Sequence, residues 1–473
     1  MPQRARNWLT PLAWVAGTTA VLLLLFPLGF PNYDTIYSLL WGRELAEGTS
    51  PDRGASLPPT PHPLYEAWGL LASPFGDGAI DLTMVLAYLS LGLVGYLVYR
   101  LGSLWFDRPV GAAAALLVLT RAPYLSNGLR AYIDLPYIAL ALAALLIETR
   151  RRRAGWPVLA LLALAGLLRP EAWLFAGAYW IYLAWDGGRS RRQLGWLAAL
   201  ALAAPLGWAA FDWITAGSPT YSFTGTRETV ETLERQTGPI DLVLYGPRRL
   251  GEVLQWPGMV GAAGGIVLGL ATMRRRSEIG VAAAALALAA FAVLACAGLA
   301  IIPRYTMLAG AILAVFAALA LLGWRLLERD HPWRRAWQAF AVLVALMLVA
   351  WGPNQYDLLH RVDVDLTNQS EIESDLRDLA GSGAFEPPCL PISVPNHRAV
   401  PRLAFDLDVR PSRIVSSSEQ RQPARGYFLA PASPFVVHNF ILDPRDPARL
   451  RTTVPAGFRR VAGNRSWLLY RRC

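Results

Sequence analysis

The sequence predicts an α-helical polytopic membrane protein with about eleven transmembrane helices, followed by a small extracytoplasmic α/β domain. Of its 473 residues, 54% are hydrophobic and only 16% are charged, which is outside the usual balance of soluble globular proteins. Apolar runs recur as far as residue 351, and from residue 352 the chain becomes polar. We therefore divide it into a transmembrane part, residues 1–351, and an outer domain, residues 352–473.

Eleven apolar runs are the candidates for transmembrane helices. They lie at residues 9–30, 79–99, 109–125, 132–147, 156–168, 172–185, 194–214, 260–273, 279–302, 306–322 and 336–351. Several are shorter than the roughly 20 residues that a spanning helix needs, so we expect tilted helices or helices that continue into polar flanks. The first run is too long for a signal peptide and lacks a small-residue cleavage site, which favours a first membrane helix.

The positions of the basic residues predict the orientation. Basic clusters fall on alternate connections, at residues 4–6, 100–108, 150–153, 189–192, 274–276 and 325–335. The positive-inside rule makes these connections cytoplasmic. The sequence thus predicts a multi-pass protein of the cell membrane whose N-terminus is cytoplasmic. The first outer loop, residues 31–78, and the C-terminal domain then face outward.

Several classes of function lose support from the sequence. The formal net charge is +10, but no separate basic domain stands out, so we expect no nucleic-acid partner. There is no phosphate-binding glycine loop, no Gly-x-Ser-x-Gly and no His-Glu-x-x-His motif, which argues against nucleotide-driven transport and ordinary hydrolases. The spacing of Cys and His gives no zinc motif. Cys389 and Cys473 can form one disulfide if the polar domain is extracytoplasmic.

The first outer loop contains two predicted juxtamembrane helices, at residues 34–47 and 63–75. The first has an apolar strip of Ile36, Leu40, Trp41 and Leu45 and a polar face of Arg43, Glu44 and Glu47. This pattern suits a helix that lies in the membrane interface.

The C-terminal domain is predicted to contain one helix followed by short strands. The helix is predicted at residues 370–383, and the strands at residues 389–394, 402–409, 426–430, 434–442 and 466–473. About 120 residues is a usual size for a domain. The sequence leaves two roles open for this domain: it binds the acceptor, or it covers the active site.

Asp34 is the first candidate for chemistry. A carboxylate at the outer end of the first span can act as a general base for an acceptor hydroxyl, or can hold a metal, because partial burial tunes its pKa. The alternative is structural: Asp is a favoured N-cap, and a helix would then begin at Thr35.

Asp134 is a second acid at the outer start of a predicted helix, beside Pro136. It too can be a helix cap. Two outward acids near one membrane surface could also act together, either as a general base assisted by a second acidic residue or as ligands of a divalent metal.

Two short outer turns carry arginine. "LLRPE" places Arg169 and Glu171 between two spans, and "PRY" places Arg304 and Tyr305 before another. Structurally, such arginines extend to lipid headgroups; functionally, the forked guanidinium suits a phosphate. Further candidates for substrate contacts are Arg121, Arg130 and His62.

Taken together, these motifs resemble the GT-C superfamily of membrane glycosyltransferases, in particular the branch with protein O-mannosyltransferases and aminoarabinose transferases. The resemblance rests on the Asp that opens a helix after the first span, the "PHPLY" stretch, the second acid at the fourth span, "LLRPE" and "PRY". It covers residues 9–351. In this superfamily a polyprenyl-phosphate carrier donates the sugar, and transfer takes place on the outer face.

The resemblance implies an inverting transferase with Asp34 as the catalytic base and Asp134 as the second acid. It implies carrier-phosphate contacts for Arg169 and Arg304, and a basic role for His62. The acceptor would be a hydroxyl of a glycan, lipid or protein. A divalent metal, Mg or Mn, serves some members of the superfamily, and the sequence does not fix whether one acts here.

Two other functions remain open from the sequence. A flippase or transporter of lipid-linked sugars would also use phosphate-binding arginines, although transporters gather their charges at mid-membrane. A non-catalytic, membrane-anchored binding protein would keep its function after Asp34 is replaced.

Overall fold

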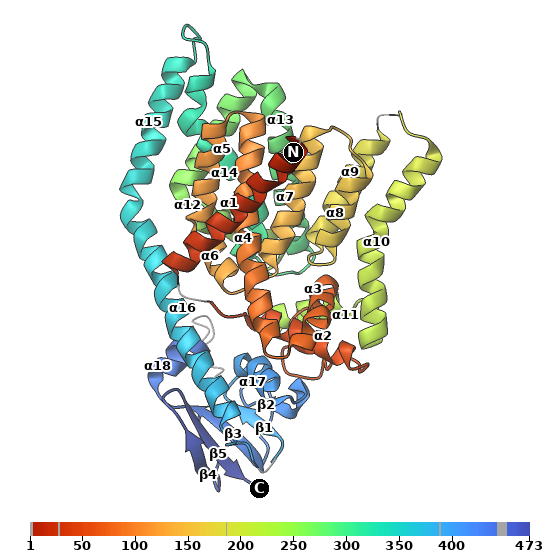
Figure 1. The fold of residues 1–473 in the computed structure, drawn as a ribbon, viewed down its shortest axis with the longest axis vertical. Helices are drawn as coiled ribbons and strands as arrows, with labels where there is room; N and C mark the ends of the chain where they lie inside the picture. The colour runs from red at the N-terminus through yellow and green to blue at the C-terminus, as the bar shows by residue number, and fades with distance from the viewer. Residues whose placement is uncertain (1–2, 27–28, 186, 387–388, 442–451) are drawn as a thin grey trace. The chain divides into compact units, whose positions relative to one another are not determined.

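Helices fill most of the chain, and one small sheet forms near its C-terminal end (Figure 1). The computed structural model describes residues 3–26, 29–185, 187–386, 389–441 and 452–473. The chain forms two compact units. We call Met1–Phe26, Val85–Phe211 and Val230–Val362 the helical unit, and Pro27–Met84, Asp212–Thr229 and Asp363–Cys473 the mixed unit.

The helical unit is built from long apolar helices. In chain order they are α1 (Gln3–Leu25), α4 (Gly78–Trp105), α5 (Arg108–Leu119), α6 (Ala122–Leu129), α7 (Asp134–Arg150), α8 (Trp156–Gly166), α9 (Glu171–Ala184), α10 (Arg191–Ala216), α12 (Gly238–Thr272), α13 (Arg274–Cys296), α14 (Met307–Leu322) and α15 (Arg334–Ala350). Short 3-10 turns η2 (Pro303–Thr306) and η3 (Gly323–Leu326) flank α14. Helices α4, α10, α11 (Tyr221–Thr232) and α16 (Gly352–Gly381) contribute residues to both units.

Helix α14 is the centre of the helical unit. It is apolar on every side and buried from Met307 to Ala320, as expected for a helix surrounded by others. It packs against α5, α12, α13 and α15. A Cβ at Gly265 of α12 would overlap the backbone carbonyl of Phe316, so α12 and α14 approach each other at this glycine.

The predicted spans coincide with helices. Five helices are long and apolar enough to cross a membrane, and the number rises to seven if each of two bent helix pairs is one span, among the residues described. Each of the eleven predicted runs overlaps a helix of the helical unit, but several of these helices, such as α8 with 11 residues, are short. A multi-pass membrane fold is therefore confirmed, and the number eleven stays a prediction.

In the mixed unit, both predicted helices of the first outer loop are present. They are α2 (Tyr33–Ala46) and α3 (Pro63–Ala72), the latter extended by η1 (Ser73–Phe75). Asn32 caps α2: its Oδ1 accepts hydrogen bonds from the backbone N–H groups of Asp34, at 2.8 Å, and Thr35, at 3.3 Å. The interpretation of Asp34 as the cap is therefore wrong, because the helix begins earlier and Asn32 fills that role.

Helices α2 and α3 touch backbone to backbone at two glycines. A Cβ at Gly42 would overlap the backbone of Gly69 and Leu70, and a Cβ at Gly69 would overlap the carbonyl of Ser38. Any other residue at either position would separate the helices. The position of α2 thus depends on α3.

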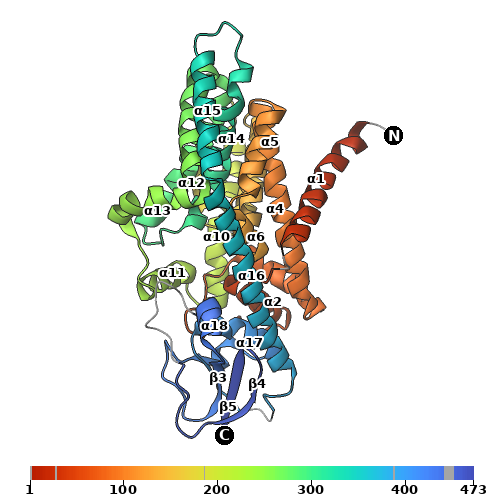
Figure 2. The same cartoon turned by 90° about the vertical axis from the view of Figure 1, so that its left-hand side faces the viewer.

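The sheet of the mixed unit has the order β2-β1-β3-β5-β4, and Figure 2 shows β3, β5 and β4 side by side. Its strands are β1 (Ile392–Val394), β2 (Ile414–Ser416), β3 (Gly426–Pro431), β4 (Arg459–Gly463) and β5 (Trp467–Arg472). Strand β1 pairs in parallel with β2 and β3, while β5 pairs antiparallel with β3 and β4. The predicted strands at residues 389–394, 426–430 and 466–473 correspond to β1, β3 and β5.

Two of the predicted strands are wrong. Residues 402–409 belong largely to helix α17 (Val400–Leu407). Of the strand predicted at residues 434–442, residues 434–441 form α18 (Pro434–Val436) and the π-turn η6 (Val437–Ile441), and residue 442 lies outside the described residues. In α17 the buried Val400, Leu403 and Ala404 recur at helical spacing, so its apolar side chains meet one core.

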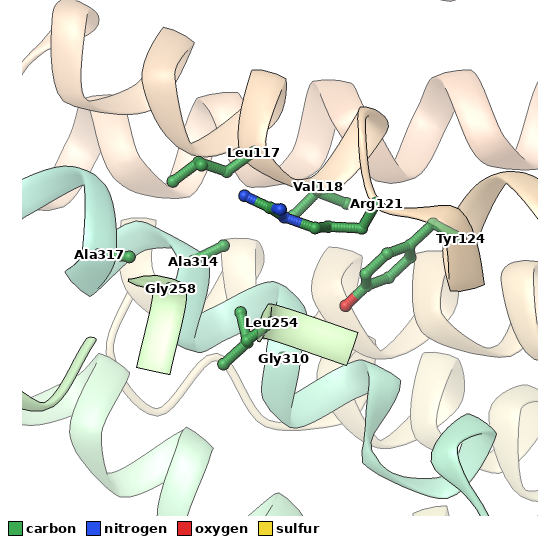
Figure 3. Close-up of a pocket in the computed structure, with 9 residues that line it drawn as sticks. All are labelled: Leu117, Val118, Arg121, Tyr124, Leu254, Gly258, Gly310, Ala314 and Ala317. Atoms are coloured by element: carbon green, nitrogen blue, oxygen red, sulfur yellow. The ribbon is translucent and has the colours of Figure 1, made fainter. Parts of the chain in front are cut away.

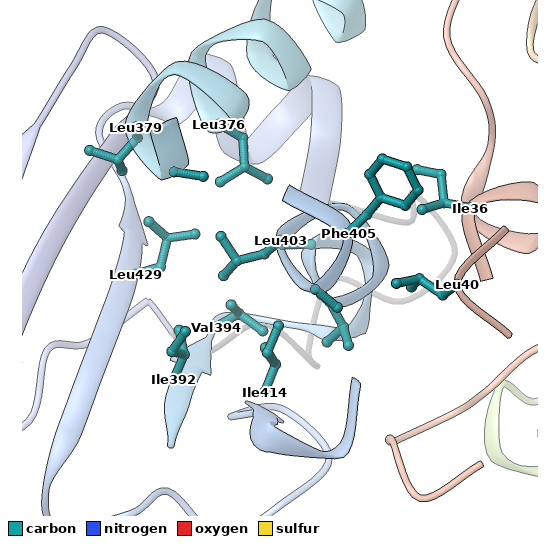
Figure 4. Packing of buried hydrophobic residues seen from close by; sticks show 14 of the residues in the cluster. Ile36, Leu40, Leu376, Leu379, Ile392, Val394, Leu403, Phe405, Ile414 and Leu429 are labelled. Carbon is teal, nitrogen blue, oxygen red and sulfur yellow. The ribbon is translucent and has the colours of Figure 1, made fainter. Parts of the chain in front are cut away.

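One hydrophobic core holds the mixed unit together, and Figure 4 shows that α2 belongs to it. Ile36 and Leu40 of α2 lie beside Phe405 of α17, in the same cluster as the buried residues of α16 and the sheet. The prediction that α2 lies in the membrane interface with Glu44 in water is therefore wrong: Glu44 is buried, and the apolar strip packs on the C-terminal segment. Cys389 and Cys473 form the predicted disulfide.

Candidate functional site

Asp34 lies in the first turn of α2 and is half-buried. The cap made by Asn32 holds its backbone N–H, and Ser38 Oγ donates to its carbonyl oxygen at 3.1 Å. The positive end of the helix dipole favours a carboxylate at this place. Both sides of the backbone at Asp34 are thus fixed by neighbouring polar side chains.

The C-terminal segment supports the residue next to Asp34. The ring of Tyr33 meets the ring of His397 edge to face, with centroids 5.4 Å apart. His397 Nδ1 lies 3.1 Å from Glu419 Oε1, and Ser416 Oγ donates to the other carboxylate oxygen. Burial alone would raise the pKa of Glu419, but the hydrogen bonds from His397 and the neighbouring serines outweigh it and lower the pKa.

His62 directly precedes α3, in extended conformation, and its side chain does not cap that helix. One turn later, Glu66 is fully buried and accepts two hydrogen bonds from Arg53 Nη2, at 3.1 and 3.0 Å. The guanidinium of Arg53 also lies 3.8 Å from the ring centroid of Trp41 in α2. This ion pair therefore links the loop after α2 to α3.

Replacing Glu66 with glutamine is expected to flatten the pH dependence of stability. Burial raises the pKa of Glu66 from 4.5 to about 7, and Arg53 only partly offsets it. Because the folded state binds this proton more tightly, the associated stability is complete below pH 4.5 and is lost as pH rises through about 7, a change of ~3 kcal/mol. Thermal unfolding of the full-length protein between pH 4 and 8 measures it. Asp81→Asn, at an exposed acid of the same unit, is the control, and parallel profiles for wild type and Glu66→Gln would refute the effect.

In the helical unit, the structure brings Asp134, Arg169 and Glu171 together. Asp134 is the first residue of α7 and Glu171 the first of α9, and all three side chains are buried. Arg169 Nη1 donates to Asp134 Oδ1, while Nη2 and Nε donate to Glu171 Oε1 at 2.6 and 3.0 Å. Asp134 is therefore not a cap, since its carboxylate binds Arg169.

This ionic cluster has more acid than base. Among the described residues, Asp134 Oδ2 and Glu171 Oε2 are buried without a hydrogen-bond partner. With two carboxylates and one guanidinium, its formal charge is −1 when both acids are ionised. A phosphate could reach Arg169 only by displacing a carboxylate, so the predicted phosphate contact of Arg169 stays a prediction.

Tyrosines connect this cluster to the "PRY" turn. The guanidinium carbon of Arg169 lies 4.3 Å from the ring centroid of Tyr305. Arg304, half-buried in η2, lies 5.6 Å from the same ring and 5.7 Å from that of Tyr132. Five of the predicted site residues therefore gather at the starts of α7, α9 and α14.

The two remaining arginines lie at the ends of α6. Arg130 follows α6, and its Nη1 donates to Ser126 Oγ at 2.7 Å. Arg121 precedes α6 and is buried, and its Nη1 donates to Gln255 Oε1 at 2.9 Å and to Gln355 Oε1 at 2.8 Å. The sequence reading missed both glutamines; the Pro at position 257, which marks a helix break near Gln255, was the available signal.

The side chains that the structure describes do not suit a metal site. Within the described residues, no group of three or more His, Cys, Asp and Glu side chains is placed to hold a metal ion. Asp134 and Glu171, which share a neighbourhood, are separated by the cationic Arg169. We therefore derive no chemical step through a metal.

The fold is similar to solved structures of ArnT, an aminoarabinose transferase, from Cupriavidus metallidurans. ArnT bound to undecaprenyl phosphate matches over 98% of each chain, with 14% sequence identity and a TM-score of 0.57. ArnT in the apo state matches 99% of this chain and 98% of its own, with 14% identity and a TM-score of 0.54. No protein-family model and no curated protein matches the sequence. The resemblance to GT-C membrane glycosyltransferases is thus confirmed at the level of the fold.

Proposed function

We propose that this chain, which has the GT-C fold along its whole length, transfers a sugar from a polyprenyl-phosphate carrier to an acceptor hydroxyl. The observation that carries the proposal is the end-to-end similarity to ArnT bound to undecaprenyl phosphate, which covers 98% of both chains. A match of this extent includes the helices, the first outer loop and the C-terminal domain together.

We assign the general base to Asp34. In the proposed step its carboxylate takes the proton of the acceptor hydroxyl while the acceptor oxygen forms a bond to the anomeric carbon. The bond from that carbon to the phosphate oxygen breaks, and polyprenyl phosphate leaves with the electron pair. One displacement inverts the anomeric configuration.

Arginines near the membrane surface would stabilise the leaving phosphate. We assign this role to Arg304 and Arg130. Arg169 would contribute if its ion pairs with the buried carboxylates of the cluster break. Asp134 would then be the second acid, which Arg169 positions. His62 and Tyr305 complete the proposed substrate contacts.

The C-terminal segment supports the proposed base through the shared core. Phe405 and Leu403 belong to the cluster that contains Ile36 and Leu40 of α2. The disulfide between Cys389 and Cys473 suits an oxidising compartment, which favours an extracytoplasmic position for this segment. We propose that it holds Asp34 in place on the outer face.

The test is a donor panel with the purified full-length protein in lipid nanodiscs. Wild type, Asp34→Asn and Asp81→Asn are compared for release of the carrier from radiolabelled polyprenyl-phosphate sugars, with a lipid or glycan acceptor present. Asp81 also lies in the first turn of a helix of the mixed unit and is exposed, so it controls for the loss of an acid at a helix start. We expect Asp34→Asn to lower the rate by about 10²–10⁴-fold and Asp81→Asn to leave it unchanged.

The other outcomes separate the alternatives. Equal turnover in wild type and Asp34→Asn would remove Asp34 as the base. If no donor is turned over but lipid-linked sugar crosses the bilayer of proteoliposomes, the protein is a flippase. A product with retained configuration would exclude the single displacement.

A further inference from the structure

The "PRY" turn η2 is held in place by Arg249, a residue of α12 that lies far from it in the sequence. Arg249 Nε donates to the carbonyl oxygen of Ile301 at 3.0 Å, two residues before η2 begins. Thr306, the last residue of η2, donates from Oγ1 to the carbonyl oxygen of Arg249 at 3.4 Å. The side chain of Arg249 therefore binds the chain before the turn, and its backbone binds the end of the turn.

All three nitrogens of the Arg249 guanidinium donate to protein acceptors. Besides the bond to Ile301, Nη1 donates to Glu252 Oε1 at 2.8 Å and Nη2 donates to Gln236 Oε1 at 3.0 Å. The backbone carbonyl oxygen of Gln236 also accepts from the N–H of Ile301 at 2.9 Å. Both backbone polar groups of Ile301 are thus bonded. A lysine could not replace this arginine, because the three bonds use a planar fork of donors that an ammonium group lacks.

The side chain of Ile301 belongs to a small hydrophobic core against which Tyr305 packs. The buried members of this core are Phe291, Ala295 and Ile301, and the partly buried side chains packed on it are Leu242, Tyr245 and Tyr305. The guanidinium carbons of Arg169 and Arg304 lie 4.3 and 5.6 Å from the ring centroid of Tyr305. A displacement of Ile301 would therefore shift the ring that contacts both guanidinium groups.

The start of α14, directly after η2, is fixed by a different residue. The hydroxyl of Tyr124 donates to the carbonyl oxygen of Met307, the first residue of α14, at 2.5 Å. Figure 3 shows the Tyr124 side chain directed toward Gly310 of α14 and Leu254 of α12, and a Cβ at Gly310 would lie 3.0 Å from that hydroxyl. Loss of the Arg249 side chain would therefore release the segment before η2 while α14 keeps its own support.

We propose that Arg249 is a positioning residue: it fixes η2 so that Arg304 and Tyr305 keep one orientation toward the substrate. The second part of this inference rests on the proposed function, which gives Arg304 and Tyr305 their roles. We assign Arg249 no substrate contact, because all three nitrogens of its guanidinium already donate to the protein. An arginine that served stability alone would lower the unfolding midpoint without changing what Arg304 contributes.

The first test measures amide hydrogen exchange of residues 301–307 in the full-length protein in lipid nanodiscs, without any sugar donor. We expect Arg249→Lys to raise the exchange rate of this segment by ~10-fold or more, because Ile301 loses a charge-assisted hydrogen bond. Arg248→Lys is the matched control: its side chain is 72% exposed and contacts the same Glu252. Gln236→Met removes one acceptor but keeps the guanidinium, and we expect a rise of ~3-fold. Wild-type exchange in every folded variant of Arg249 and Gln236 would overturn the proposal.

The second test asks whether Arg249 acts through Arg304. Turnover and unfolding midpoints are measured for Arg249→Lys, Arg304→Gln and the double variant, with the donor that the panel identifies. We expect Arg249→Lys to lower kcat/KM by ~10- to 100-fold in the wild-type background and by less than ~3-fold when Arg304→Gln is already present. Equal losses in both backgrounds would overturn the positioning role. If wild type turns over no donor, the proposed transfer fails, whereas the exchange test still decides whether Arg249 fixes η2.

Discussion

Arg169→Met is expected to destabilise the protein by about 3–5 kcal/mol, because the buried carboxylates of Asp134 and Glu171 would lose the guanidinium that pairs with both. Thermal or denaturant unfolding of the full-length protein in detergent measures the loss. Arg100→Met is the matched control: that guanidinium bonds to the neutral hydroxyl of Tyr96 at 2.9 Å, so its removal leaves no unpaired charge.

A combined variant separates stability from binding. Adding Asp134→Asn and Glu171→Gln to Arg169→Met removes both uncompensated charges and should recover most of the lost stability. If Arg169 also contacts the carrier phosphate, this variant will fold and yet bind the carrier poorly. An Arg169→Met variant as stable as Arg100→Met would show that the carboxylates do not depend on the guanidinium.

Gly42→Leu is expected to cost ~3 kcal/mol or more, because its side chain would occupy the space of the α3 backbone at Gly69. The new side chain must separate α2 from α3. Since α2 carries Asp34, we also expect the proposed transfer to fall. Unfolding midpoints and turnover are measured on the same preparations.

Gly225→Leu provides the comparison for that variant. Gly225 lies in α11 of the same unit, and a Cβ there meets nothing within 4 Å. We expect at most a small change in stability at this position. A Gly42→Leu protein as stable as Gly225→Leu would show that α2 and α3 do not need their close approach.

Local patterns were enough for the helices of the helical unit and for α2 and α3 of the mixed unit. Apolar runs predicted where the helices of the helical unit lie, because a helix whose side chains are all buried or lipid-facing is apolar along its length. Pro63 and the polar residues around it marked the start of α3. Short segments of the C-terminal domain were less certain: residues 402–409 alternate enough to suggest a strand, but the helical spacing of Val400, Leu403 and Ala404 matches the core.

The candidate site was predictable as a set of residues but not as a set of contacts. Asp134, Arg169 and Glu171 were identified separately at two helix starts, and their ionic cluster forms because α7 and α9 bring these starts together. Glu66 and Arg53 gave no signal, since a buried ion pair between a loop and a helix has no local pattern. Gln255 and Gln355 were missed for the same reason, being 100 residues apart along the chain.

By itself, the sequence predicted a multi-pass membrane protein, because hydropathy is a property of the chain, and its short motifs resembled those of the GT-C superfamily. Only the tertiary structure decided what those residues contact. It showed that Asn32, not Asp34, caps α2, and that the apolar strip of α2 faces Phe405 and Leu403 instead of lipid. It also left Arg121 with neutral partners while giving Arg169 two acids. The physical reason is that hydrophobicity fixes how much surface must be buried, whereas the partner of each side chain depends on which distant segments pack together.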